Sequence, residues 1–171
     1  WLSVCHANPD PAAENCHFGY RDPDWVESGF GENFMPNIGV IGGGTMGTGI
    51  AYVCAQAGGE VLVVEPDKVR AEQMRASQHA AAQSAVSRGK MTADDAATIG
   101  ERITVVSAVS GLPSGLDLIV ESVFEDMALK RGILADAAAR QPALLASNTS
   151  ALSIDRLAEG LLAPASFLGM H

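Results

Sequence analysis

Three glycines with the spacing G-x-G-x-x-G are the first residues in this sequence that could do chemistry. Gly42, Gly44 and Gly47 follow the apolar run 38–41 and open the stretch 45–57, which reads as a helix. In such a loop the first glycine permits a tight turn, the second lets a pyrophosphate approach the backbone, and the third lets the helix pack closely on the strand. The free N–H groups at the helix N-terminus favour the negative charge of phosphates. The loop therefore predicts a phosphate-binding site.

An acidic residue stands where a dinucleotide site needs one. Residues 61–64 form a second apolar run, which ends on Glu65. Glu65 comes 23 residues after Gly42 (65 − 42), close to the roughly 20 at which a carboxylate binds the adenosine ribose. Strand, glycines, helix, strand and acid thus occur in one βαβ-sized unit. This combination favours a dinucleotide site over a purely structural turn.

Carboxylate, hydroxyl and imidazole groups follow three later apolar runs. A histidine can accept a proton from an alcohol while hydride leaves the carbon, because its unperturbed pKa lies near neutrality. A serine hydroxyl can hold the substrate oxygen as either an alcohol or a carbonyl. Together they point to alcohol oxidation beside a nicotinamide, although each residue alone also suits a turn, a core or a helix start. The runs are 116–120, 143–146 and 165–170, and the groups after them include Glu121, Glu125, Ser147, Asn148, Thr149, Ser150 and His171.

Apolar runs alternate with helical stretches throughout 37–171, and these elements must position the groups named above. Thr92 and Ser153 are expected to cap helices, and Gly89 to end one. The alternation predicts an α/β fold of the Rossmann type, a doubly wound, mostly parallel sheet with helices on both faces. Ligands of such sheets lie at the carboxyl ends of the strands, so all these groups should meet at one edge. The expected strands are 38–41, 61–64, 103–106, 116–120, 143–146 and 165–170, and the expected helices are 45–57, 68–88, 92–100, 126–140 and 154–159.

The composition excludes several classes of protein. The 171 residues include 11 basic and 20 acidic ones, for a net charge of −9, and no basic patch favours a nucleic-acid partner. No apolar run approaches the roughly 18 residues of a membrane span. Three cysteines without a C-x-x-C pair predict neither a disulfide framework nor a metal site, and Cys54 reads as a core residue. We expect a soluble protein of a reducing compartment, either cytoplasmic or, in a eukaryote, in the mitochondrial matrix.

Residues 1–36 differ from the rest of the chain. They hold four of the eight prolines and both tryptophans, and they show no helical or strand period. We expect an irregular N-terminal arm. Its cysteines and histidines match no zinc spacing, so chance placement in a loop is the favoured interpretation; they are Cys5, His6, Cys16 and His17.

From about residue 37 to 171, the sequence resembles the NAD-binding domain of the L-3-hydroxyacyl-CoA dehydrogenase family, which includes 3-hydroxybutyryl-CoA dehydrogenases. The matching segments are GVIGGGTMGTGIA, the strand ending on Glu65, DLIVESVFEDMALK, LLASNTSALSI and FLGMH. They occur in the order that the family has them. The resemblance covers all of the chain except the arm.

This resemblance implies a role for each matching residue. Glu65, where the family usually has Asp, would bind the adenosine ribose and disfavour the extra phosphate of NADP, so the implied cofactor is NAD. The implied reaction is hydride transfer between NAD and the C3 hydroxyl carbon of a 3-hydroxyacyl-CoA, in fatty acid metabolism. The implied cofactor-binding residues are Gly42, Gly43, Gly44, Thr45, Met46, Gly47, Glu65, Glu125, Lys130 and Ser150. The implied substrate-binding residues are Ser150 and Asn148, and the implied catalytic residues are His171 and Ser150.

Two parts of the family pattern have no counterpart in this sequence. Family members have a glutamate about a dozen residues after the histidine, then a helical C-terminal domain that closes the substrate site and forms the dimer. We therefore expect a cofactor-domain fragment, inactive alone, of a homodimeric parent that binds acyl-CoA. Two alternatives remain open. One is a non-catalytic NAD-binding relative, crystallin-like or a sensor, and the other is a relative that acts on another 3-hydroxy acid.

Overall fold

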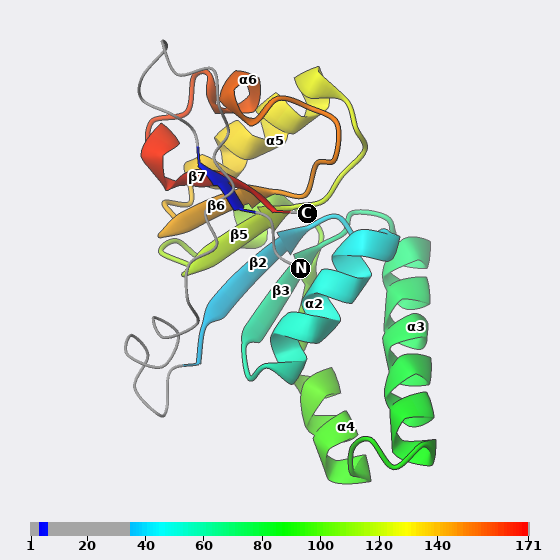
Figure 1. Ribbon diagram of the computed structural model, residues 1–171. Helices are drawn as coiled ribbons and strands as arrows, with labels where there is room; N and C mark the ends of the chain where they lie inside the picture. Colours follow the sequence, from blue (N-terminus) through cyan, green and yellow to red (C-terminus); the bar gives the residue numbers. More distant parts are fainter. Residues whose placement is uncertain (1–3, 7–34, 171) are drawn as a thin grey trace.

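A seven-stranded sheet forms the centre of the molecule in the computed structural model, which describes residues 4–6 and 35–170 (Figure 1). The strand order is β1-β7-β6-β5-β2-β3-β4. Counted along the chain, the parallel strands follow the Rossmann order 3-2-1-4-5-6, so the predicted fold class is confirmed. The parallel strands are β2 (Asn37–Ile41), β3 (Glu60–Val64), β4 (Ile103–Val106), β5 (Leu118–Glu121), β6 (Leu144–Ser147) and β7 (Phe167–Met170).

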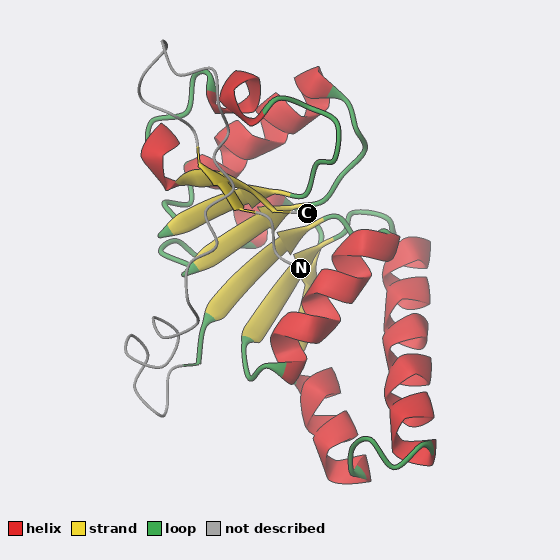
Figure 2. Cartoon of the chain, viewed as in Figure 1, coloured by secondary structure: helices red, strands yellow, loops and turns green. Residues whose placement is uncertain are grey.

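Helices cover both faces of this sheet (Figure 2). Three of them pack together on one side of it, and the other two lie on the opposite side (Figure 1). The first group is α2 (Thr45–Gln56), α3 (Lys68–Ser87) and α4 (Ala93–Glu101), and the second is α5 (Met127–Ala138) and α6 (Ile154–Ala158). The short 3-10 helices η1 (Val109–Gly111) and η2 (Pro164–Ser166), which the sequence did not predict, precede β5 and β7.

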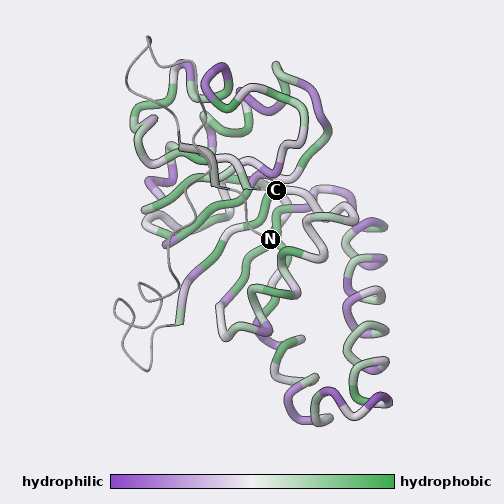
Figure 3. Tube along the Cα trace, in the orientation of Figure 1, coloured by the Kyte–Doolittle hydropathy of each residue, from purple (hydrophilic) through white to green (hydrophobic). Residues whose placement is uncertain are grey.

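Alternation of side chains along β2 builds two cores. Ile38 and Val40 pack with residues of α2, α3 and α4, whereas Ile41 packs on the opposite face with residues of α5 and α6. Successive side chains of a strand point to opposite faces, so an all-apolar strand requires a helix layer on each side. Hydrophobic stretches accordingly follow the strands, while α3 mixes hydrophilic and weakly hydrophobic residues (Figure 3).

The predicted caps are also in place. Thr92 and Asp95 form a capping box at the start of α4, and the Ser153 hydroxyl accepts a hydrogen bond from the Arg156 N–H at the start of α6. Gly89 follows α3 with a φ of +66°, a conformation that glycine adopts without strain. Every predicted helix and strand begins and ends within two residues of its predicted bounds.

One prediction for the N-terminal segment is wrong at three residues. β1 (Val4–His6) is a strand, antiparallel to β7, where an irregular arm was expected. Without β1, β7 would be an edge strand with unpaired backbone N–H and C=O groups. Any short extended segment can pair with these groups, whatever its side chains, so the side chains do not mark the strand in the sequence. The other residues of 1–34 lie outside the described part, including Cys16 and His17 of the proposed chance cluster. In the part of the chain that is described, no helix is long and apolar enough to cross a membrane.

Candidate functional site

The glycine loop has the geometry that its spacing predicts. Gly42 has a φ of +110°, and a Cβ there would lie 2.5 Å from the Ser122 carbonyl oxygen. A Cβ on Gly47 would lie 1.9 Å from the Gly42 carbonyl oxygen, so helix and strand meet too closely for any side chain. A Cβ on Gly44, in contrast, would meet no atom within 4 Å. The open space over Gly44 is therefore where a phosphate can reach the backbone.

The N-terminus of α2 is ready to bind an anion. Gly44 is its N-cap residue, no side chain caps the helix, and its first turn holds no acidic residue. The first N–H groups of a helix have no partner within the helix, and the helix dipole attracts negative charge there. A pyrophosphate would supply the acceptors that this helix start lacks.

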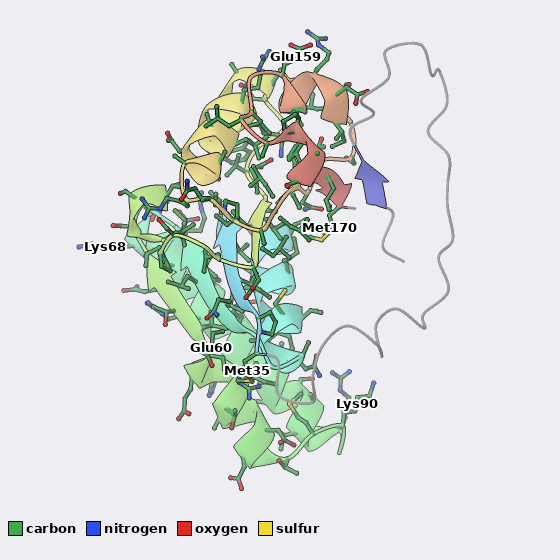
Figure 4. The ribbon with its side chains drawn as sticks, turned by 90° about the vertical axis from the view of Figure 1, so that its left-hand side faces the viewer. Met35, Glu60, Lys68, Lys90, Glu159 and Met170 are labelled. Atoms are coloured by element: carbon green, nitrogen blue, oxygen red, sulfur yellow. The ribbon has the colours of Figure 1, made fainter. Side chains whose placement is uncertain are left out.

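Glu65 lies at the end of β3, beside this loop. Its side chain is almost fully buried, and its two oxygens accept the N–H groups of Gly43 and Asp67, each at 3.0 Å. Each carboxylate oxygen keeps a further lone pair, so both can still accept ribose hydroxyls. Arg70 lies 3.7 Å from Glu65, whereas Lys68 points away from the ribbon (Figure 4).

A cavity of ≈ 660 Å³ lies at the carboxyl ends of β2, β3, β5 and β6. It includes most of the residues that the sequence predicted for a site, from both halves of the sheet. Gly43 and Gly47 shape the loop without lining the cavity, and His171, after β7, lies outside the described residues. The predicted residues that line the cavity are Gly42, Gly44, Thr45, Met46, Glu65, Glu125, Asn148 and Ser150.

Glu125 joins the loop after β5 to the loop after β6. Its carboxylate accepts the Thr149 hydroxyl at 2.9 Å and the Ser150 N–H at 3.0 Å. Partial burial alone would raise the pKa of Glu125, but the hydrogen bonds from Ser150 and Thr149 and the nearby charge of Lys130 outweigh it, so the pKa lies below its ordinary value. An ionised carboxylate thus stands at the cavity wall next to Ser150.

Lys130 lies behind the cavity wall. It was expected to face the cofactor, but its side chain is fully buried and does not line the cavity. Its ammonium lies 2.8 Å and 3.1 Å from the two carboxylate oxygens of Glu121, which is also fully buried, and 3.6 Å from Glu125. Glu121 ends the buried strand β5, and a buried carboxylate needs a counter-ion, so it draws the lysine inward.

Three further residues line the cavity without being among the site residues that the sequence predicted. They are Arg70, Phe124, which is 75% exposed, and Val109 of η1. Arg70 and Phe124 lie within five residues of Glu65 and Glu125 in the sequence, whereas Val109 reaches the cavity because β4, which precedes it, pairs with β3. No group of three or more metal-ligating side chains occurs in residues 35–170.

A glycine turn, an uncapped helix N-terminus and a carboxylate at the end of the next strand define a dinucleotide-binding domain. Residues 37–171 match the family model described as 3-hydroxyacyl-CoA dehydrogenase, NAD binding domain. The chain belongs to this family, and NAD is its cofactor. The buried Glu65 and the open space over Gly44 fit the ribose and the pyrophosphate of that cofactor.

Curated relatives and solved structures agree with this assignment. The chain is 38% identical over 140 residues to a 3-hydroxybutyryl-CoA dehydrogenase of Mycobacterium tuberculosis, covering 80% of the chain and 49% of the relative. It is 34% identical to a peroxisomal bifunctional enzyme of Cavia porcellus, covering 100% of the chain and 24% of the relative. The crystal structure of a 3-hydroxybutyryl-CoA dehydrogenase from Escherichia coli superposes with a TM-score of 0.76 at 32% identity, covering 81% of the chain and 29% of that structure.

These matches carry two further facts. The chain spans half or less of the length of each of these relatives. The alignment with the bifunctional enzyme covers the whole chain, so the arm, which lies outside the family resemblance of residues 37–171, also has a counterpart in this relative. Residues 1–36 contain no periodic pattern or motif by which a family resemblance could be recognised from this sequence alone.

Proposed function

We propose that the protein is an NAD-dependent dehydrogenase that oxidises the C3 hydroxyl group of 3-hydroxyacyl-CoA substrates. The observation that carries the proposal is that one cavity contains both the glycine loop and the pair Glu125 and Ser150. The loop can bind the phosphates of a dinucleotide, and Ser150 offers a hydroxyl to a substrate oxygen at the far end of the same cavity. The substrate class is supported by the similar proteins, which are 3-hydroxybutyryl-CoA dehydrogenases.

In this proposal, different residues along the cavity bind different parts of the cofactor and the substrate. The N-terminus of α2 holds the pyrophosphate and Glu65 the adenosine ribose, which leaves the nicotinamide end towards β5 and β6. When bound, NAD supplies the acceptor for the hydride. Ser150 holds the substrate oxygen, and Glu125 fixes the position of Ser150 through its backbone N–H. In this proposal His171, which follows β7, takes the proton from the hydroxyl group.

An assay of the full-length protein with acetoacetyl-CoA and NADH tests this proposal. We expect acetoacetyl-CoA to cause NADH oxidation, and Ser150→Ala to lower kcat by about 100-fold, since it removes a donor to the reacting oxygen. Ser77→Ala, an exposed serine on α3, is the matched control and should leave the rate unchanged. NADH binding without oxidation would favour the non-catalytic relative, and activity only with free 3-hydroxy acids would favour the other alternative.

The partner and the compartment are part of the same proposal. We propose that the full-length protein is a homodimer, as the family resemblance implies, and sedimentation analysis would test this. A cytoplasmic or mitochondrial location stays a prediction. The relatives include bacterial and peroxisomal enzymes, so the compartment varies within the family.

A further inference from the structure

Two fully buried charges lie next to the cavity without lining it. Glu121 ends β5 and Lys130 belongs to α5, and both side chains are 0% exposed. Their shortest N–O distance is 2.8 Å. In such a pair the loss of hydration offsets much of the attraction, so the pair is weak evidence for stability on its own. Its other contacts show what else it does.

Both charges hold the backbone of one residue, Val123. The Val123 N–H donates to Glu121 Oε1 at 2.7 Å, and the Val123 carbonyl oxygen accepts from Lys130 Nζ at 3.2 Å. Val123, Phe124 and Glu125 all line the cavity. The ion pair therefore fixes the chain at the point where it enters the cavity wall.

The same charges also connect to the loop after β6. Ser147 is paired with Glu121 across β5 and β6, and its hydroxyl donates to Glu121 Oε2. Lys130 Nζ lies 3.6 Å from Glu125 Oε2, and Glu125 in turn accepts from Thr149 and Ser150. One buried cluster thus contacts both loops that bring polar groups to the cavity.

We infer that Glu121, Lys130 and Ser147, here named the buried clamp, are positioning residues of the cofactor site. The clamp holds the 122–125 loop against the 148–150 loop, so that Glu125 and Ser150 face the cavity in a fixed arrangement. Lys130, which does not line the cavity, acts on the site through Glu125. The inference rests on the proposed function only through cofactor binding, which is measured by itself.

A triple variant of the full-length protein separates positioning from stability. Glu121→Met, Lys130→Met and Ser147→Ala together replace the polar cluster by apolar side chains, a change that often preserves stability because no charge is left unpaired. We expect a melting temperature within about 5 °C of the wild type. We expect the Kd for NADH, from its fluorescence on binding, to rise about tenfold, since the loops lose their fixed arrangement.

The matched control is Arg131→Met. Arg131 is the next residue of α5, and its ion pair with Glu159 is exposed. This variant should bind NADH as the wild type does. Wild-type affinity in a folded triple variant would overturn the inference.

The pH dependence of NADH binding gives a readout that a merely structural role would not move. In the wild type Lys130 helps to keep Glu125 ionised, so affinity should fall only in acid. Without that cation, the fall in affinity should begin at a higher pH, and Glu125→Gln should abolish this shift. An equal loss of affinity at every pH would contradict the inference.

Ser147→Ala alone keeps the inference testable if the triple variant does not fold. It removes one hydroxyl and leaves the ion pair intact. We expect the Kd for NADH to rise about threefold and amide hydrogen exchange at Val123 and Ser150 to become faster. No change in either quantity would overturn the inference. A wild type that binds NADH but turns over no acyl-CoA would refute the proposed function and leave this test in force.

Discussion

The two halves of the cavity are built in different ways. On the β2–α2–β3 side, the contacts for a ligand come from backbone N–H groups, three glycines and one carboxylate, Glu65. On the β5–β6 side, they come from side chains held by other side chains, with the buried clamp behind them. A site built from backbone groups needs residues without side chains, so that the ligand can reach the backbone. A site built from side chains needs a partner for each buried charge.

This difference decides what a mutation does in each half. In the glycine half, adding a side chain should be harmful. The position of each glycine determines whether the added atoms lower the stability of the fold or the affinity for the ligand. In the β5–β6 half, removing a charge should do the damage, because it leaves a buried partner unpaired. Four single substitutions test this contrast, from the largest expected effect to the smallest.

Gly47→Ala should damage the fold. Its Cβ would lie 1.9 Å from the Gly42 carbonyl oxygen, a backbone atom that cannot move without separating α2 from β2. We expect the free energy of unfolding, measured with urea, to fall by about 3 kcal/mol. Gly49→Ala is the control in the same helix, since a Cβ there meets nothing within 4 Å. Equal stability of the two variants would mean that close packing at Gly47 is not required.

Gly44→Ala should damage ligand binding and spare the fold. No atom lies within 4 Å of its Cβ, and its backbone is extended, with a φ of −70°. The methyl group would occupy the space through which the pyrophosphate approaches. We expect calorimetry to show a Kd for NAD raised about 30-fold, with a stability loss of at most about 1 kcal/mol from the poorer N-cap. Unchanged NAD affinity would make the loop purely structural.

The same contrast explains how much the sequence predicts. The glycine half follows from local spacing, because strand, turn and helix are contiguous and each glycine has one conformational or steric reason. The cap of α4 follows for the same reason, since Thr92 and Asp95 are three residues apart. The environment of Lys130 does not follow, because its partner Glu121 is buried only through the order of strands in the sheet. β1 is beyond local reasoning as well, since its pairing depends on the free edge of β7.

Glu65→Gln should weaken the preference for NAD over NADP. In the wild type the carboxylate repels a 2′-phosphate and holds Arg70 at 3.7 Å, so we expect tighter binding of NAD than of NADP. The amide removes the repulsion and frees Arg70 to meet the phosphate. The ratio of the two Kd values, from calorimetric titration, should narrow about tenfold. Glu60→Gln, an exposed acid on the same strand, is the control. Equal or tighter NADP binding by the wild type would contradict the assignment of Glu65.

Glu125→Gln should have the smallest effect on stability. The pKa of Glu125 is lowered in the folded protein, so its contribution is present above the unfolded value and is lost as the pH falls through the folded value. Because the carboxylate is 40% exposed, we expect a loss of only about 0.5 kcal/mol in the free energy of unfolding at neutral pH. That difference should vanish in acid, where the wild-type carboxyl is protonated. Urea unfolding at neutral and acidic pH measures it, with Glu159→Gln as the control. If the difference in unfolding free energy persisted in acid, Glu125 would stabilise the two loops by shape alone. The charge of Glu125 would then not contribute to holding the cavity wall on the β5–β6 side.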